Sequence, residues 1–170
     1  MNDNFEQALA TVLKSEGGYV NNPKDPGGMT NLGVTKATYE QYVGHPVDEE
    51  TMRGLTPDDV GPLYKSMYWD AVRGDQLPDG VDYCVFDVAV NSGPTKAIKL
   101  LQNAVGTPQT GQISDRDVQL ANAADLNDII TKICNERLVF LQSLNTWATF
   151  GKGWTSRVAF VQRTALKMLA

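Results

Sequence analysis

The sequence has one histidine and two cysteines, and this scarcity argues against several classes of enzyme. His45 stands in the turn-forming triplet GHP. Most zinc hydrolases need two or more imidazoles, and a serine triad needs one placed against a nucleophile. Cys84 and Cys134 lie in apolar helical patterns without CxxC spacing, so we interpret them as core thiols, the usual role of free cysteine. A cysteine–histidine hydrolase using His45 is the alternative for these residues.

Long apolar runs, a leader pattern and an excess of basic residues are also missing. No stretch approaches the ~20 apolar residues that span a bilayer, and MNDNFEQALATVLKSE lacks the basic and apolar regions of a signal peptide. The 15 basic and 20 acidic residues give a net charge of -5, which argues against a nucleic-acid partner. No phosphate loop or dinucleotide fingerprint is present. We therefore expect synthesis in the cytosol without a signal peptide, no transmembrane segment, and no metal or other cofactor.

Apolar residues recur at helical spacing through most of the chain, which predicts a mainly α fold. In the long helix predicted at about 125–144, Arg137 is the charged residue on an otherwise apolar face. No alternating run has convincing strand length, but residues 19–34 leave room for a short hairpin. Helices are expected at about 3–16 with an Asp3–Glu6 capping box, at 35–42 capped by Thr35, and from Thr56 and Pro57 to Trp69 or Ala71. Further helices are expected over the apolar face from Val81 to Ala89, which SGP breaks, over TKAIKLLQNAVG, at about 125–144, and from a cap at Thr155 onward.

The stretch SEGGYVNNPKDPGG places Glu16 at the end of the first predicted helix, directly before Gly17 and Gly18. The two glycines end that helix, and at least one of them is expected to have φ > 0. Turn-forming residues explain the loop that follows. They do not explain the glutamate.

Without metal ligands or a nucleophile, the remaining chemistry is that of carboxylates, which indicates glycoside cleavage. A general acid must carry its proton when it meets the substrate. An amphipathic helix end is partly apolar and lies near the negative end of the helix dipole, and both features oppose ionisation. Glu16 is therefore a candidate general acid. The alternative is a solvated glutamate at a helix end.

The segment EGGYVNNPKDPGGMTNLGVT resembles the signature of glycoside hydrolase family 108, the muramidase endolysins and related secreted lysozymes. That signature has EGGY, then DPGG, then a threonine and GVT. The stretch YKSMYWDAVRGDQLPDGVDYCVFDVAVNSGPTKAIKLLQNAVG is similar to the middle of the same family, and GKGWTSRV is similar to its closing GW and Arg. The similarity is collinear over nearly the whole chain.

This resemblance implies a lysozyme-like helical fold with a small β-hairpin after the first helix, formed by residues 1–170 as a single catalytic domain. Residues 1–90 would contain the catalytic Glu16, and residues 91–170 would form a helical part that resembles a peptidoglycan-binding region. The segment from Ser92 to about Ala123 contains TGQIS in place of the more usual DG-x-IG. We therefore interpret it as the second helical lobe and not as a separate domain.

The implied activity is that of an N-acetylmuramidase, or lysozyme, which cleaves the β-1,4 bond between N-acetylmuramic acid and N-acetylglucosamine. Two alternatives are a lytic transglycosylase that uses Glu16 alone and a non-catalytic wall-binding module. The implied substrate is bacterial peptidoglycan, acted on by a monomer in the periplasm or outside the cell. Access would depend on a phage holin or on a secretion system. The net negative charge disfavours approach to an anionic wall.

A looser similarity links the loop to phage-type lysozymes, which carry Glu, then Asp nine residues later, then Thr six beyond that. Glu16 and Asp25 keep the first spacing, whereas Thr30 follows Asp25 by five residues. Asp25 is the candidate second carboxylate, and Thr30 is a candidate for positioning water. The alternative is that Asp25 only folds the loop, because Asp before Pro commonly forms a turn.

Two aromatic residues are candidates for sugar contact. Trp69 is either part of the hydrophobic core or a stacking surface, and core packing is the more common fate of large aromatics at helical spacing. Tyr19 follows Glu16 closely and is expected to line a cleft.

Four polar residues complete the set of candidates. Asn91 and Ser92 are expected to hydrogen-bond the acetamido groups of the substrate, or else to cap the helix that begins at Pro94. Asp87 lies one turn before Asn91 and is a candidate for orienting it. Arg157 is expected to pair with a buried carboxylate.

Overall fold

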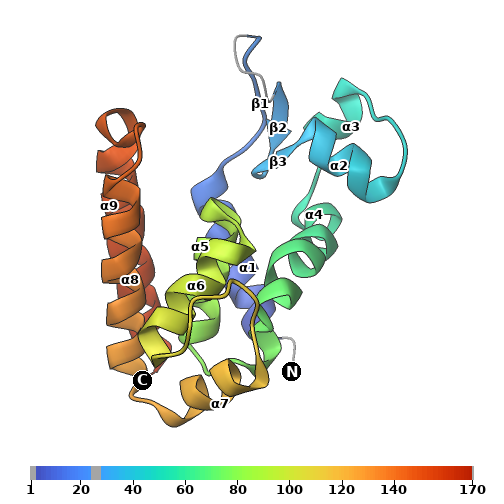
Figure 1. Cartoon of the computed structure of the whole chain (residues 1–170). Coiled ribbons are helices and arrows are strands. Elements are labelled where there is room, and N and C mark those ends of the chain that lie inside the picture. Colours follow the sequence, from blue (N-terminus) through green and yellow to red (C-terminus); the bar gives the residue numbers. More distant parts are fainter. Residues whose placement is uncertain (1–2, 24–27, 170) are drawn as a thin grey trace. The chain divides into compact units, whose positions relative to one another are not determined.

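The computed structural model describes residues 3–23 and 28–169, which fall into two compact units. One unit is Glu6–Ser66, and the other combines Met1–Phe5 with Met67–Ala170. Helices dominate both units, and a small antiparallel sheet lies in the first (Figure 1). This confirms the mainly α, lysozyme-like fold with a small β element. No described helix is long and apolar enough to cross a membrane.

Among the described residues, the first unit holds the sheet, three whole helices, and a fourth helix from Glu6 onward, the start of which belongs to the other unit. Strand β1 pairs with β2, and β2 pairs with β3, so the short hairpin expected within residues 19–34 is a three-stranded antiparallel sheet. Asn31 of β2 is buried, and its Nδ2 donates to the carbonyl oxygen of Met52, 2.8 Å away, which joins the sheet to α3. The elements are α1 (Asp3–Glu16), β1 (Val20–Asn21), β2 (Met29–Asn31), β3 (Val34–Thr35), α2 (Lys36–Val43), α3 (Glu49–Arg53) and α4 (Pro57–Tyr64).

The helix ends of this unit follow local sequence signals. Helix α1 ends at Glu16, and Gly17 has φ +79°, which confirms the expected left-handed glycine; Gly18 has no positive φ. Thr35 caps α2 as expected. Helix α3 was not predicted, although Asp48 caps it by accepting from the Thr51 N–H at 2.8 Å. The expected Asp3–Glu6 box rests on the Asp3 side chain, which lies outside the described part of the chain.

The helix predicted from Thr56 to Trp69 or Ala71 changes type along its length. Thr56 forms the N-terminal capping box of α4, whose regular ladder ends at Tyr64. A π-helical turn covers Lys65–Trp69, and 3-10 turns follow at Asp70–Val72 and Gly74–Gln76. Pro62 lies inside α4 and supplies no N–H donor, so the α-helical ladder is already weakened two residues before it ends.

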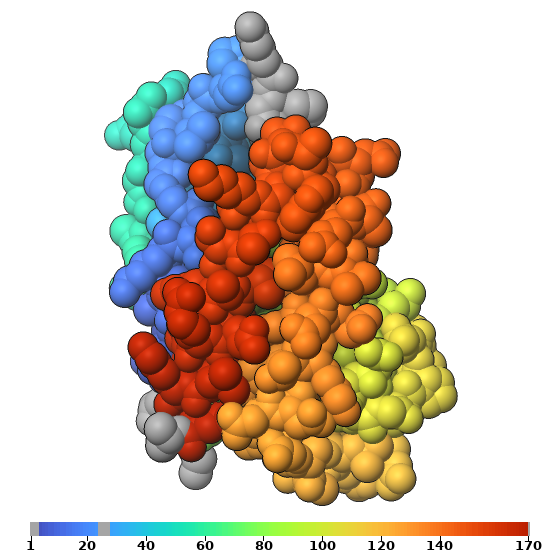
Figure 2. Space-filling model, turned by 90° about the vertical axis from the view of Figure 1, so that its left-hand side faces the viewer, coloured from blue at the N-terminus to red at the C-terminus, as the bar shows by residue number. Residues whose placement is uncertain are grey.

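The second unit contains the remaining helices. Helix α5 is its centre, because all nine residues from Val81 to Ala89 are buried. Helix α5 packs on α6, α8 and α9, and Figure 2 shows α8 and α9 as adjacent orange and red ridges. From the sequence we expected the boundary between the two parts of the chain near residue 90, whereas the compact units divide the chain between residues 66 and 67. The helices are α5 (Val81–Ser92), α6 (Pro94–Val105), α7 (Asp115–Ala123), α8 (Leu126–Gln142) and α9 (Trp147–Lys167).

The predicted start of the last helix is wrong. Helix α9 begins at Trp147, and Thr155 lies inside it with its hydroxyl donating to the carbonyl oxygen of Gly151 at 2.7 Å. Thr155 was expected to be the cap of this helix, because threonine is a common N-cap residue. Gly151 is required by packing, since a β-carbon there would lie 2.6 Å from the Trp147 indole.

Cys84 on α5 and Cys134 on α8 are buried free thiols, which confirms the core interpretation. Their Sγ atoms are 3.7 Å apart. The neighbouring thiol of Cys134, together with burial, holds the pKa of Cys84 well above its ordinary value. Such a thiol is a poor nucleophile, because only the thiolate attacks.

Candidate active site

Glu16 is the last residue of α1, and its side chain is half-buried. The turn between β2 and β3 lies directly against it. A β-carbon built on Gly33 of that turn would be 2.9 Å from both Cβ and Cγ of Glu16 and 2.5 Å from Tyr64 Oη. Only a glycine fits there without displacing a neighbour, so the turn and the Glu16 side chain fix each other's position.

The β2–β3 turn has the backbone of a two-residue hairpin loop. Leu32 has φ 51° and Gly33 has φ 77°, and both lie between the paired residues Asn31 and Val34. Positive φ at both central residues is the mark of a type I′ turn, which usually carries Asn-Gly. Leucine is disfavoured in that conformation. The Tyr64 hydroxyl donates to the Leu32 carbonyl oxygen at 2.7 Å and so stabilises the turn.

Thr30 occupies the middle of β2, where it pairs with Val20 on one side and Thr35 on the other. Successive side chains of a strand point to opposite faces. Because Asn31 is buried toward α3, Thr30 lies on the opposite face of the sheet, where it is half-buried. Asp25 lies outside the described residues. The roles of Asp25 and Thr30 therefore stay predictions.

Tyr19 lies between α1 and β1 and contacts α3. Its hydroxyl donates to Glu49 Oε1 at 3.3 Å, and the Arg53 guanidinium lies 4.3 Å from the centre of its ring. Arg53 in turn binds Glu49 at 2.8 Å, and this hydrogen bond lowers the pKa of Glu49. Tyr19 thus has one ring face and its hydroxyl engaged, and its contact with a substrate stays a prediction.

Trp69 is a correction to the predicted substrate-binding set. Its side chain is 0% exposed, and its ring makes edge contacts with Phe5 and Phe86, each at 5.4 Å between centroids. Its Nε1 donates to Asp75 Oδ1 at 2.9 Å. No face of this indole is open to a sugar, so the core-packing alternative holds.

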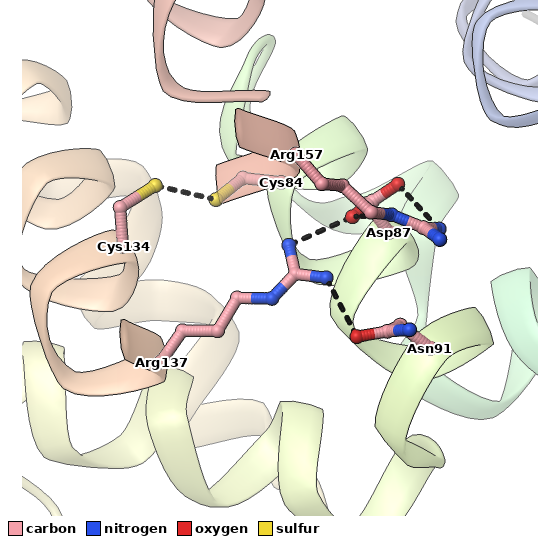
Figure 3. Close-up of polar contacts among 6 residues, drawn as sticks. All are labelled: Cys84, Asp87, Asn91, Cys134, Arg137 and Arg157. Atoms are coloured by element: carbon pink, nitrogen blue, oxygen red, sulfur yellow. Dashed lines mark hydrogen bonds and ion pairs between the residues drawn. The ribbon is translucent and has the colours of Figure 1, made fainter. Parts of the chain in front are cut away.

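A cluster of charged side chains surrounds the end of α5 (Figure 3). Asp87 and Arg137 have side chains 1% exposed, and Arg137 Nη1 donates to Asp87 Oδ2 at 2.7 Å. Arg157 Nη2 donates to Asp87 Oδ1 at 3.0 Å, which confirms its pairing with a buried carboxylate. Asn91 Oδ1 accepts from Arg137 Nη2 at 3.2 Å. Asp87 therefore reaches Asn91 through Arg137 and not directly.

Arg137 was not among the predicted site residues. The signal was present, because an arginine within an apolar helical face must find a buried partner or pay the cost of an unpaired charge. Its partner could not be named from the sequence, since Asp87 lies 50 residues away.

Asn91 and Ser92 end α5 and are both half-buried. Gly93 is the N-cap of α6 and makes no side-chain capping bond. Neither Asn91 nor Ser92 therefore serves as the cap of the helix at Pro94, which was the alternative to substrate binding. Their contact with acetamido groups stays a prediction.

Comparison with known proteins adds two findings. Residues 9–93 match the family described as glycosyl hydrolase 108. The chain is also similar to a solved structure titled "Structure of Brucella abortus SagA", with 42% sequence identity, a TM-score of 0.87, and coverage of 99% of this chain and 97% of that one. No curated protein matches the chain.

Proposed function

Because the chain belongs to glycosyl hydrolase family 108 and is on that ground a peptidoglycan hydrolase, we propose that it is an N-acetylmuramidase. The bond cleaved is the β-1,4 linkage between N-acetylmuramic acid and N-acetylglucosamine. Glu16 is the general acid. The reaction is hydrolysis, of the lysozyme type.

The observation that supports this role is the setting of Glu16. It is the last residue of α1, and its side chain is half-buried. Its methylene groups are held against Gly33, so the carboxyl group is positioned by the two-residue turn and by Tyr64 behind it. Preorganisation of this kind is what a general acid needs, because a misplacement of about 1 Å can cost ~100-fold in rate.

The proposed chemistry needs one proton donor and one water. The Glu16 carboxyl group donates its proton to the glycosidic oxygen as the C–O bond breaks and positive charge develops on the muramic acid ring. Asp25 stabilises that charge or activates the water, and Thr30 positions the water. The water adds to the anomeric carbon and gives its proton to the carboxylate of Asp25 or Glu16, and Glu16 is protonated again before the next turnover. The products are two chains, one with a new reducing end.

The test compares Glu16→Gln with Glu6→Gln, an exposed glutamate on the same helix, for turnover of purified peptidoglycan. General acid catalysis typically contributes 10²–10⁴-fold, so Glu16→Gln should lose at least ~100-fold while Glu6→Gln stays near wild type. Mass spectrometry of the products should find reducing N-acetylmuramic acid ends. Circular dichroism checks that both variants are folded.

Other outcomes assign other functions. Products with 1,6-anhydro ends would identify a lytic transglycosylase, in which the sugar's own hydroxyl replaces water. A Glu16→Gln variant that clears walls at the wild-type rate would exclude Glu16 as the acid, and wall binding without any cleavage by the wild type would indicate a binding module.

The roles of Asp25 and Thr30 are tested separately with Asp25→Asn and Thr30→Ala. A second carboxylate that acts in the chemistry predicts a loss of at least ~100-fold for Asp25→Asn. Thr30→Ala should cost less, because a threonine hydroxyl only orients the water. An Asp25→Asn variant that keeps most of its activity while Glu16→Gln is inactive would remove Asp25 from the mechanism.

We also propose that the enzyme acts as a monomer on the wall, in the periplasm or outside the cell, and that it reaches the wall through a holin pore or a secretion system. Expression in bacterial cytoplasm should then cause lysis only when a holin is co-expressed. Lysis without any such partner would contradict this dependence, and sedimentation of the purified protein gives its oligomeric state.

A further inference from the structure

We propose that Arg137 positions the Asn91 side chain so that its amide nitrogen faces away from the guanidinium, and that the N–H donors of this nitrogen recognise the carbonyl oxygen of an N-acetyl group on the glycan. Arg137 is then a positioning residue for substrate specificity. The inference rests on the proposed function, because it names the substrate group that Asn91 binds.

The orientation of the Asn91 amide follows from the chemistry of its partner. A guanidinium carries only N–H donors. Arg137 Nη2, 3.2 Å away, can therefore be met only by the oxygen of the Asn91 side chain. The amide nitrogen must lie on the other side, and Figure 3 shows it turned away from Arg137.

The guanidinium is buried and is held by a carboxylate. The Arg137 side chain is 1% exposed, and Asp87 Oδ2 accepts a hydrogen bond from its Nη1 at 2.7 Å. Asp87 is held in turn by Arg157, so residues of α5, α8 and α9 fix one arrangement. Arg137 Nε has no hydrogen-bond partner among the described residues. Within the cluster the Nε–H of Arg137 thus makes no hydrogen bond, whereas its Nη2 donates to Asn91 Oδ1.

The free end of Asn91 is ready for a ligand. The residue is half-buried at the end of α5, and no described residue pairs with its Nδ2. An N–H donor at this point selects an acceptor. The acetamido carbonyl is a strong neutral acceptor that both sugars of the glycan carry, whereas a de-N-acetylated sugar offers an ammonium group, which only donates.

The test uses peptidoglycan in two forms, fully N-acetylated and enzymatically de-N-acetylated. The variants are Asn91→Ala, Arg137→Met, Arg137→Lys, and the control Arg116→Met at an exposed arginine of α7. Wild-type enzyme and Arg116→Met should prefer the acetylated wall in kcat/KM by ~10-fold or more, because a site built to hydrogen-bond a group rejects the analogue that lacks it. Asn91→Ala should lose this preference by slowing only on the acetylated form.

Arg137→Met should lose the preference although Asn91 is still present, and adding Asn91→Ala to it should cause no further loss. Because Arg137→Met disturbs a buried ion pair, its fold is checked by thermal unfolding. Arg137→Lys keeps the charge and should retain part of the preference. Equal losses on both walls in Asn91→Ala would overturn the acetamido assignment, and a full preference in both Arg137 variants would overturn the positioning role.

A binding measurement separates this inference from the proposed function. Glu16→Gln enzyme should sediment with acetylated walls more than with de-N-acetylated walls, and Asn91→Ala in that background should abolish the difference. If wild type cleaves neither wall, the proposed function fails while this binding difference still tests Asn91. If cleavage proceeds and the binding difference is absent, only the present inference fails.

Discussion

At the scale of single residues, Gly33 is the sharpest test of how Glu16 is held. Gly33→Ala places a methyl group 2.9 Å from Glu16 Cβ and Cγ, and its φ of +77° disfavours any side chain. The strain costs roughly 1 kcal/mol, and the methyl group must displace Glu16 or the turn. We expect turnover of peptidoglycan to fall by ~100-fold, much more than the loss of thermal stability suggests.

The matched control for this prediction is Gly44→Ala. Gly44 also has a left-handed φ, +82°, but nothing lies within 4 Å of a β-carbon built there. Its backbone cost should therefore be similar, and its turnover should stay close to wild type. Similar turnover in the two variants would show that contact with Glu16 is unimportant for catalysis.

Asp82 is a buried carboxylate outside the candidate site, and it makes stability depend on pH. Burial raises its pKa from 3.8 to about 6, although the Asn4 hydrogen bond at 2.9 Å opposes the shift. Between pH 4 and pH 6 Asp82 is ionised in the unfolded chain but stays protonated in the folded protein. The contribution of Asp82 to the free energy of unfolding is therefore complete below about pH 4, and it is lost as the pH rises through about 6. Asp82→Asn does not ionise. Relative to wild type, its free energy of unfolding should rise by on the order of 2 kcal/mol from about pH 4 to about pH 7.

Urea denaturation at several pH values measures this difference. The control is Asp79→Asn, because Asp79 is exposed and accepts a hydrogen bond from the same Asn4. Its stability difference from wild type should rise much less over this range, because the Asp79 charge is only a minor cause of the raised pKa of Asp82. A difference for Asp82→Asn that stays constant with pH would mean that Asp82 ionises normally in the native protein.

At the scale of elements, the ends of short helices depend on single capping residues. Ser114 is the N-cap of α7. Its Oγ accepts from the Asp117 N–H at 3.2 Å, and its own N–H donates to Asp117 Oδ2 at 3.0 Å. Asp117 also accepts from Thr107 and Gln102, which joins α7 to α6. Ser114→Ala removes the cap and should cost about 1 kcal/mol of stability in denaturant unfolding.

A serine inside a helix provides the comparison. Ser156 lies on the exposed side of α9 and donates to the carbonyl oxygen of Lys152. Alanine is the better helix former there, so Ser156→Ala should be neutral or slightly stabilising. Equal destabilisation by both substitutions would mean that the Ser114 cap is not what holds the start of α7.

At the scale of the whole molecule, charge is unevenly distributed along the chain. All 20 acidic residues lie at or before Glu136, whereas residues 137–170 carry basic residues and no acidic one. On α9, Lys152, Arg163 and Lys167 are exposed and fall within roughly 60° of one another around the helix axis. This basic stripe is a local attraction for an anionic wall in a protein whose net charge is -5.

Reversing the basic stripe tests its contribution. A variant with Lys152→Glu, Arg163→Glu and Lys167→Glu should clear anionic walls about 10-fold more slowly at low salt, because steering depends on local charge. The difference should shrink as the salt concentration rises, since the screening length is about 3 Å at 1 M. Turnover of short uncharged glycan fragments should be unaffected. A loss that persists at high salt would instead indicate a direct contact.

Some features were predicted from the sequence because they depend on near neighbours in the chain. The end of α1 at Gly17, the Thr35 cap and the start of α4 after Thr56 each involve residues within four positions of one another. The burial of α5 followed from its nearly continuous apolar face. The family resemblance, carried by EGGY, DPGG and GVT in order, identified Glu16, whose catalytic role awaits the Glu16→Gln test.

Other local signals were present and were given too little weight. The caps of α3 and α7 follow the same rules as those of α2 and α4, but both helices are short and lie beside turn-forming residues. Thr155 shows the opposite error, because a residue type that is common at helix starts lies here inside α9, where its hydroxyl donates to the carbonyl oxygen of Gly151.

By itself, the sequence determined the helical class, most helix ends and the identity of the candidate acid, because periodicity, capping and motif order are properties of adjacent residues. Only the tertiary structure decided which side chains meet. Trp69 became core because Phe5 and Phe86 close over it, and Asn91 acquired its orientation from Arg137, 46 residues away. Gly33 touches Glu16 only after the strands pair. These contacts join residues far apart in the chain, and their geometry is set by packing, which no local pattern encodes.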